Sequence, residues 1–371
     1  MLLKFWVQGY RCFFERTEID FTDKKNYRFG RECVRGDLLD KVVILGNNGS
    51  GKTSFGYALL DITSTLTGFN KDVGQCNPVC FINGSGKNDH AVFHYEFAYH
   101  GSTVIYEYGK RSCDVLKSES LSVDRHVIFD YDLDDMGSAV FDLGSLGSGR
   151  IPVPELDGSM PLLRLIGDSV RLDPSSPVAS VLEFARNSIY YMAMWKVDVH
   201  IGFMDEEDDI ERFIVENGLV EELMQFLGNE CGITVRLSAR DGSLMVDAGS
   251  KEYPFLQIAS RGTAILCRLF CWNRRSRDKG AIMFFDDFDD LFDHRTAENV
   301  MTHIIRSSQA QCVFVTHNTT LFSSDTLRPD CCFIMKDGVL RSIPSRTDKS
   351  IRKGHNLEKM LRDGEFDSDL S

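Results

Sequence analysis

A short stretch near the start of the chain has the residue types and spacing of a phosphate-binding loop. Four apolar residues at 42–45 predict a buried strand, and residues 54–66 predict a helix. Between them stands the run Gly46-Asn47-Asn48-Gly49-Ser50-Gly51-Lys52-Thr53, in which Gly-x4-Gly is followed by lysine and threonine. Glycines let backbone N–H groups approach a phosphate chain, and the start of a helix adds unpaired donors and partial positive charge.

This P-loop pattern predicts a role for several of its polar groups. We expect Lys52 to reach the β- and γ-phosphates of ATP, and we expect the Thr53 hydroxyl to be a ligand of Mg2+. ATP and Mg2+ are therefore the predicted cofactors. The residues expected to bind the nucleotide here are Gly46, Asn47, Asn48, Gly49, Ser50, Gly51, Lys52, Thr53 and Ser54.

Two aspartates follow a second buried strand. The apolar run 281–285 leads directly into Asp286 and Asp287. A carboxylate at the end of a strand that neighbours the P-loop strand is the Walker B arrangement, so we expect Asp286 to hold Mg2+, directly or through water. Asp287 stands where a general base or a water-orienting carboxylate is needed. We therefore expect Asp287 to be catalytic, together with Lys52.

A histidine follows a third buried strand. The strand predicted at 311–315 is followed by Thr316, His317 and Asn318. A histidine at such a strand end can reach the γ-phosphate and the attacking water. His317 is therefore the third predicted catalytic residue.

A second helix start with anion-binding character precedes the Walker B strand. The run Ser260-Arg261-Gly262-Thr263 opens a helix expected at 261–272, and its N–H groups and the Ser260 hydroxyl can bind an anion. In a sheet wound with alternating strands and helices, this helix start does not easily serve the nucleotide held by its own P-loop. We therefore expect it to contact the nucleotide bound to a partner subunit.

Composition indicates a globular protein. The chain has 371 residues, with 43% hydrophobic and 26% charged residues, and no run approaches the roughly 20 apolar residues of a membrane span. Its start is too soon interrupted by charge to be a signal peptide, so we expect a cytoplasmic location without membrane association. The net charge of −13 argues against attraction of nucleic acid to the whole surface, although a local basic groove stays possible.

The order of patterns predicts an α/β protein with a central sheet between helices. Early strands are expected at 2–7, 17–21, 91–97, 104–108 and 126–131, and helical spacing covers 160–168, 177–194 and 208–228. A hairpin is expected at 233–246 and another at 331–343. We divide this single head into an N-terminal lobe with the P-loop (1–150), a mostly helical insertion (151–255) and a lobe with the remaining motifs (256–371).

The order of P-loop, Ser-Arg-Gly-Thr, Phe-Phe-Asp-Asp and Val-Thr-His-Asn resembles the ABC-type ATPase heads of the RecF/SMC/OLD group. The chain is most similar to the stand-alone AAA-family ATPases of bacterial abortive-infection and anti-phage loci. The opening run Gly9-Tyr10-Arg11-Cys12-Phe13 and the closing segment 350–366 are similar to the ends of that family. The resemblance implies a P-loop NTPase fold with a mixed central sheet, an N-terminal antiparallel β subdomain and an α-helical insertion.

The resemblance also implies roles for individual residues. It makes Asp286 the Walker B aspartate and His317 the switch histidine, and it implies that Ser260 and Gly262 contact ATP across a head-to-tail dimer. Two residues depart from the family pattern. Asp287 replaces the usual glutamate and is one methylene shorter, and Arg261 occupies a position in the signature that is usually small. Both departures bear on turnover more than on binding.

Three functions follow from these patterns. The first is an ATP-hydrolysing switch subunit of an anti-phage or abortive-infection system, in which two copies clamp ATP and control a separate effector such as a nuclease or toxin. The second is a DNA-repair or recombination clamp of the RecF kind, which predicts salt-dependent DNA binding. The third is a scaffold that binds ATP without hydrolysing it, which the short Asp287 keeps open.

Overall fold

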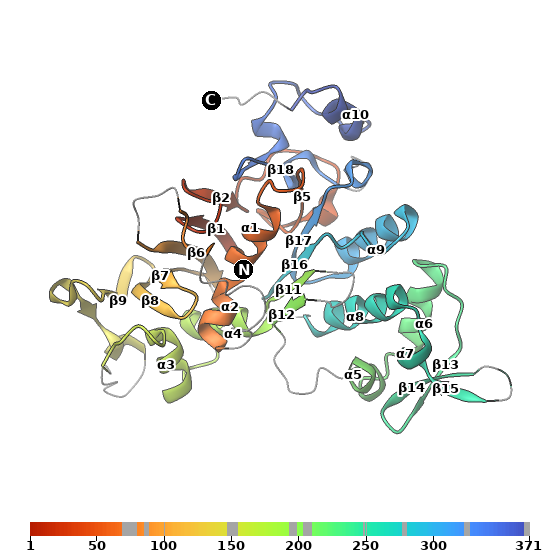
Figure 1. Ribbon diagram of the computed structural model, residues 1–371, viewed down its shortest axis with the longest axis horizontal. Coiled ribbons are helices and arrows are strands. Elements are labelled where there is room, and N and C mark those ends of the chain that lie inside the picture. Colours follow the sequence, from red (N-terminus) through yellow and green to blue (C-terminus); the bar gives the residue numbers. More distant parts are fainter. Residues whose placement is uncertain are drawn as a thin grey trace.

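Two seven-stranded sheets form the body of the molecule (Figure 1). The computed structural model describes residues 1–68, 80–84, 89–99, 101–146, 155–192, 199–202, 210–247, 249, 251–276, 280–322 and 327–366. The first sheet is antiparallel throughout, with the order β10-β9-β8-β7-β6-β1-β2. Its strands are β1 (Leu2–Gln8), β2 (Thr17–Asp20), β6 (Ala91–Tyr99), β7 (Ser102–Ser112), β8 (Val115–Val123), β9 (His126–Asp132) and β10 (Val140–Phe141).

The second, central sheet is mixed and has the order β12-β11-β16-β17-β5-β18-β19. Its strands are β5 (Lys41–Leu45), β11 (Ile189–Met192), β12 (Val199–Ile201), β16 (Ile282–Asp286), β17 (Gln311–Thr316), β18 (Cys332–Lys336) and β19 (Val339–Ser342). The five strands from β11 to β18 are parallel, and only the two edge strands run antiparallel to their neighbours. Every residue of β5, β16 and β17 is buried, as expected for continuous apolar strands covered on both faces.

The strand order corrects one expectation. The Walker B strand was expected beside the P-loop strand, but β17 lies between β16 and β5. The neighbours of the P-loop strand are therefore β18 and β17, the strand that His317 follows. The register keeps all three strand ends together, because Thr316 pairs with Leu45 and Asp286 pairs with Val315.

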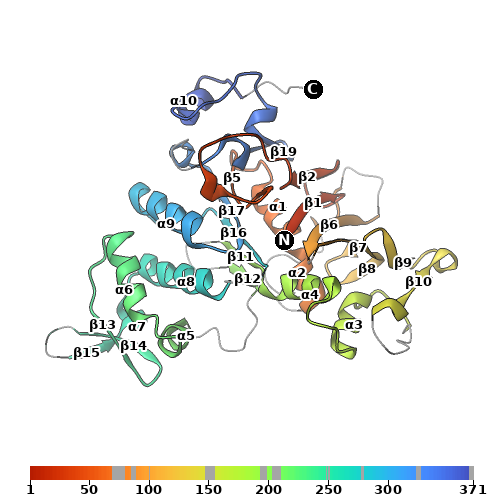
Figure 2. The same ribbon diagram turned by 180° about the vertical axis from the view of Figure 1, so that it is seen from behind.

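Helices α1 and α8 pack on the central sheet, and other helices pack on the antiparallel sheet or beside the small third sheet. The helices of the described structure are α1 (Lys52–Leu59), α2 (Asp61–Thr67), α3 (Leu162–Ser169), α4 (Pro177–Asn187), α5 (Ile210–Glu216), α6 (Val220–Asn229), α7 (Phe255–Ile258), α8 (Arg261–Arg275), α9 (His294–Ser307) and α10 (Leu357–Arg362). A third sheet of β13 (Leu237–Arg240), β14 (Ser243–Asp247) and β15 (Glu252–Pro254) projects beside α5, α6 and α7, far from the antiparallel sheet (Figures 1 and 2). None of these helices is long and apolar enough to span a bilayer.

Several elements differ from their predicted form. The helix expected at 54–66 is two helices that break at Leu60, and the one expected at 208–228 breaks at Gly218, whose φ is +65°. The helical spacing at 177–194 was wrong in its second half, because α4 ends at Asn187 and the next residues form β11 of the central sheet. The hairpin expected from 233 begins at Leu237, and β8 was not predicted.

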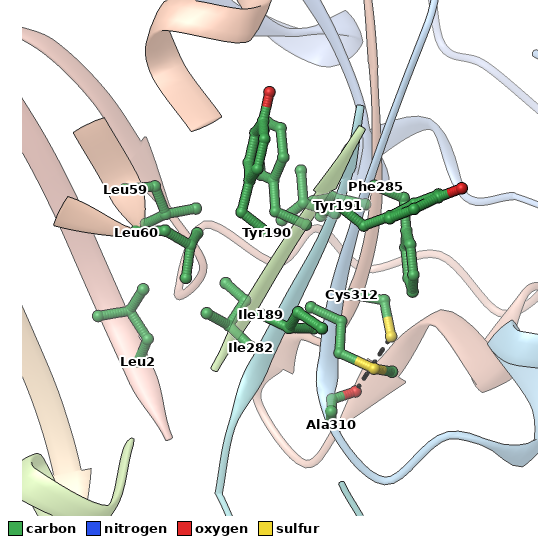
Figure 3. Packing of buried hydrophobic residues seen from close by; sticks show 14 of the residues in the cluster. Leu2, Leu59, Leu60, Ile189, Tyr190, Tyr191, Ile282, Phe285, Ala310 and Cys312 are labelled. Carbon is green, nitrogen blue, oxygen red and sulfur yellow. Dashed lines mark hydrogen bonds between the residues drawn. The ribbon is translucent and has the colours of Figure 1, made fainter. Parts of the chain in front are cut away.

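The two large sheets are joined by a buried core. Figure 3 shows Leu2 of β1 and Leu59 and Leu60 at the end of α1 beside Ile189 and Ile282 of the central sheet. The side chain of Gln311, at the start of β17, accepts from Leu2 N at 2.8 Å and donates to Leu2 O at 2.9 Å. The amide of Gln311 therefore fixes the position of β1 relative to the central sheet.

Candidate nucleotide-binding site

The P-loop adopts backbone conformations that favour glycine. Gly49 and Gly51 have φ values of +80° and +108°, in the region that L side chains rarely adopt. A Cβ at Gly46 would lie 2.6 Å from Met335 O, and one at Gly51 would lie 3.1 Å from the sulfur of Cys12. The backbone of β18 thus contacts the loop at Gly46, and the Cys12 side chain in the turn after β1 contacts it at Gly51. A larger residue at either position would come too close to these atoms, so the fold requires the two glycines.

Lys52 is held over the loop that it follows. Its side chain is buried, and Nζ donates to Gly46 O at 2.7 Å and to Asn47 O at 3.0 Å. Gly51 precedes α1, whose first turn is closed by the bond from Phe55 N to Gly51 O at 2.8 Å. The ammonium group and the N–H groups of the helix start therefore face the same loop, which is the donor set that a triphosphate requires.

Asp286 lies at the buried end of β16 with one oxygen available. The residue is 0% exposed, and its Oδ2 accepts from the hydroxyl of Tyr190 at 2.9 Å. Burial raises the pKa of Asp286 to about 6, against the lowering effect of hydrogen bonds from Thr53 and Tyr190. Within the described structure Oδ1 has no hydrogen-bond partner. A buried carboxylate oxygen without a partner, close to the Thr53 hydroxyl, is the hard-oxygen donor set that Mg2+ prefers, so the residues present fit this ion.

Asp287 and His317 approach each other from neighbouring strand ends. His317 Nδ1 lies 3.7 Å from Asp287 Oδ1 and 3.8 Å from Asp290 Oδ1, and the His317 side chain is half exposed. Asp287 has a φ of +45°, a conformation that aspartate tolerates better than most residues. One ligand atom from each of Asp287, Asp290 and His317 lies within 4.8 Å of the others. Two predicted catalytic side chains thus meet in the structure.

Three further residues lie at this edge of the sheet and were not predicted from the sequence. Burial and the nearby charge of Asp287 raise the pKa of Asp290, whose Oδ1 lies 3.8 Å from His317 Nδ1. Asp289 accepts a hydrogen bond from the Thr316 hydroxyl at 3.0 Å and so holds the end of β17. Tyr190 of β11 is the third. The doubled Asp-Asp pairs around Phe288 were the available signal for the two aspartates, whereas no motif indicated Tyr190.

The helix start at Ser260 lies elsewhere. Ser260 caps α8 by accepting from Thr263 N at 3.2 Å, and it is exposed. Outside the backbone of its own helix, the nearest atoms to a Cβ built on Gly262 are Leu291 O at 3.7 Å and Ser260 Oγ at 4.0 Å. Among the described residues, the predicted signature turn, including Arg261, is therefore beside the loop after β16 and not part of the P-loop cradle.

Two neighbouring tyrosines show that α1 and α8 cover opposite faces of the central sheet. The ring of Tyr190 lies 4.7 Å from that of Tyr57 on α1, and the ring of Tyr191 lies 5.0 Å from that of Trp272 on α8. Consecutive side chains of a strand point to opposite faces, and Figure 3 shows the two tyrosines diverging. The P-loop helix and the signature helix are therefore on different sides of the sheet.

Comparison with known proteins agrees with the motifs. Residues 41–323 match the family model described as "AAA domain, putative AbiEii toxin, Type IV TA system". Comparison with curated protein sequences gives no significant match.

Among solved structures, the SMC head domain from Thermotoga maritima is similar with a TM-score of 0.43, at 13% identity over 91% of this chain and 97% of that one. An SMC head bound to the C-terminal winged-helix domain of ScpA gives 0.49, at 14% identity over 92% and 97%. An SMC head with an extended coiled coil, bound to a ScpA domain from Pyrococcus furiosus, gives 0.45, at 13% identity over 97% and 98%. The family match covers more than half of the chain, and the chain therefore belongs to this family of AAA ATPase domains.

Proposed function

We propose that this protein is an ATP-binding and slowly ATP-hydrolysing switch subunit of a prokaryotic anti-phage or abortive-infection system. The observation that supports it best is the convergence of Lys52, Asp286 and His317 at one edge of the central sheet. Lys52 would bind the phosphates, and Thr53 with Asp286 would hold Mg2+, which neutralises phosphate charge when bound. Asp287 and His317, whose side chains approach to 3.7 Å, would orient the attacking water.

We propose further that two copies enclose the nucleotide. The exposed Ser260 turn lies at the start of α8, on the opposite face of the sheet from α1. A nucleotide on the P-loop of one copy would therefore meet Ser260, Arg261 and Gly262 of a second copy. Contacts of this kind exist only while the γ-phosphate joins both copies, so hydrolysis would reverse the association and release a separate effector, a nuclease or a toxin.

The first experiment measures ATP binding, ATP turnover and molar mass in solution. The wild-type protein should bind ATP with Mg2+ and shift from monomer to dimer, and Lys52→Ala should abolish binding. Lys349→Ala removes an exposed lysine outside the site and serves as the matched control. Substitution of Ser260 by arginine should leave ATP binding intact and prevent the dimer. Nucleotide binding that survives Lys52→Ala would contradict the proposal.

The short carboxylate at Asp287 favours a second candidate, an ATP-dependent scaffold that does not turn over. Binding and dimerisation without measurable hydrolysis would support it. A clamp of the RecF kind instead requires tight DNA affinity that falls steeply with salt, and this can be measured on the same samples. A pull-down of the native partner would identify the effector.

A further inference from the structure

Tyr190 is a buried side chain that none of the nucleotide-binding motifs contains. It lies on β11, beside the Walker B strand, and is 0% exposed. The centre of its ring lies 4.7 Å from that of Tyr57 of α1 and 5.6 Å from that of Phe284 of β16. Its hydroxyl donates to Asp286 Oδ2 at 2.9 Å. The tyrosine therefore connects the P-loop helix to the carboxylate expected to hold Mg2+.

The hydrogen bond determines which carboxylate oxygen is available. Tyr190 bonds Oδ2 of Asp286, whereas Oδ1 has no hydrogen-bond partner in the described part of the chain. A carboxylate held at one oxygen by a packed phenol cannot rotate freely, so its second oxygen stays directed to one place. The ring contacts with Tyr57 and Phe284 restrict the phenol itself.

We infer that Tyr190 is a positioning residue for the metal-nucleotide site, which orients Asp286 toward Mg2+ through its phenolic hydroxyl. This inference rests on the proposed function, because it needs Mg2+-dependent nucleotide binding. The effect reaches α1 as well, since the ring of Tyr190 contacts that of Tyr57, and Tyr57 belongs to the helix that Lys52 begins. Movement of the P-loop helix on nucleotide binding would thus be transmitted to the metal-binding carboxylate.

The test is the Mg2+ concentration needed for half-maximal binding of a fluorescent ATP analogue. Tyr190→Phe removes one oxygen and keeps the ring, and we expect the half-saturating Mg2+ concentration to rise about tenfold or more, as for other residues that support a metal ligand. Tyr191→Phe is the matched control, because it removes the same group from the next residue on the opposite face of the strand. It should leave the half-saturating concentration unchanged.

A double-mutant cycle separates positioning from general stability. In an Asp286→Asn background, Tyr190→Phe should have little further effect on Mg2+ dependence, because the group through which it acts is already altered. If Tyr190→Phe lowers the melting temperature too far for measurement, the same titration is made at a lower temperature, at which the variant stays folded. Equal Mg2+ dependence in wild type and Tyr190→Phe would overturn the inference and leave the proposed function standing. Absence of Mg2+-dependent binding in the wild type would overturn the proposed function itself.

Discussion

Each of the two large sheets contains a buried carboxylate, and the two carboxylates differ in how many of their hydrogen bonds are formed. In the antiparallel sheet, Glu119 of β8 is 1% exposed and accepts four hydrogen bonds. Oε1 accepts from Tyr106 at 2.9 Å and from Leu163 N at 3.1 Å, and Oε2 accepts from Tyr131 at 2.7 Å and from Leu162 N at 2.6 Å. The two N–H groups belong to the start of α3, which has no cap of its own, so Glu119 caps that helix from a neighbouring strand.

In the central sheet, the buried carboxylate of Asp286 lacks a full set of hydrogen bonds. Asp286 is at least as buried as Glu119, yet its Oδ1 has no hydrogen-bond partner, and the same holds for Oδ1 of Asp287 and Asp289 in the described structure. A buried polar atom without a hydrogen-bond partner lowers the stability of the fold, because it has given up its hydrogen bonds to water. Burial is thus common to both carboxylates, and they differ in the hydrogen bonds that they accept: Glu119 has donors on both oxygens, whereas Asp286 has one oxygen left for the proposed Mg2+.

The largest expected effect is on the saturated carboxylate. Glu119→Gln should lower the free energy of unfolding by about 3 kcal/mol or more, because an amide cannot accept from all four donors. Denaturant unfolding followed by circular dichroism measures this loss. Glu18→Gln, at a half-exposed glutamate of β2, is the control and should change stability by less than about 0.5 kcal/mol. A Glu119→Gln protein as stable as wild type would break the comparison.

Asp286→Asn is expected to stabilise the fold at pH 8, whereas Glu119→Gln is expected to destabilise it. The pKa of Asp286 is about 6 in the fold against an ordinary 3.8, so the folded chain binds more protons than the unfolded chain between these values. Its stability in metal-free buffer should therefore fall by roughly 3 kcal/mol as the pH rises from about 4 to about 7, relative to Asp286→Asn. At pH 8 the variant should be the more stable protein and should need a higher Mg2+ concentration to bind ATP. Parallel pH profiles for the two proteins would contradict this.

The comparison can be extended to Asp287, where the length of the side chain is expected to limit ATP turnover. Asp287→Glu restores the missing methylene and should raise ATP turnover about ten- to a hundredfold, if a displacement of about 1 Å limits the attacking water. Steady-state phosphate release measures it. Stability should fall by no more than about 1 kcal/mol, the cost of a longer side chain at a φ of +45°. Unchanged turnover would show that the reach of this carboxylate does not limit the reaction.

The smallest effect is expected for a single donor of the saturated set. Tyr131→Phe leaves three hydrogen bonds on Glu119 and should cost about 1–2 kcal/mol of unfolding free energy. Phe129→Leu, a conservative change two residues earlier on β9, provides the packing control. A loss as large as that of Glu119→Gln would mean that the four bonds do not share the stabilisation.

Local patterns predicted much of the fold and most of the groups that meet at its edge. The P-loop, the run ending at Asp286 and the strand ending before His317 each combine an apolar strand with polar residues at its end, and such signals need no long-range information. The structure confirmed the mixed α/β fold, and it brought Asp287 and His317 together. The roles of these residues, and the contact of Ser260 with a second copy, stay predictions.

What was missed depended on distant partners. β8 was not foreseen because its inward-facing residues include Glu119, which is buried only through donors on other elements. Residues 189–192 were assigned to a helix because an apolar run after α4 continues helical spacing, and only pairing with β16 makes them a strand. The order of β5, β17 and β16 is equally absent from local sequence. Tyr190 was missed for the same reason as its strand.

The two hydrogen bonds between the Gln311 amide and the backbone of Leu2 limit how the molecule can move. One end of β17 is fastened to β1 by the Gln311 amide, and the turn after β1 packs Cys12 against Gly51. The antiparallel sheet and the nucleotide cradle are thus tied at two points and should travel as one block. If two copies open and close around the nucleotide, the hinge is expected near α8 and the small sheet β13–β15. Spectroscopic labels that report nucleotide-driven motion should therefore be attached in that half of the molecule.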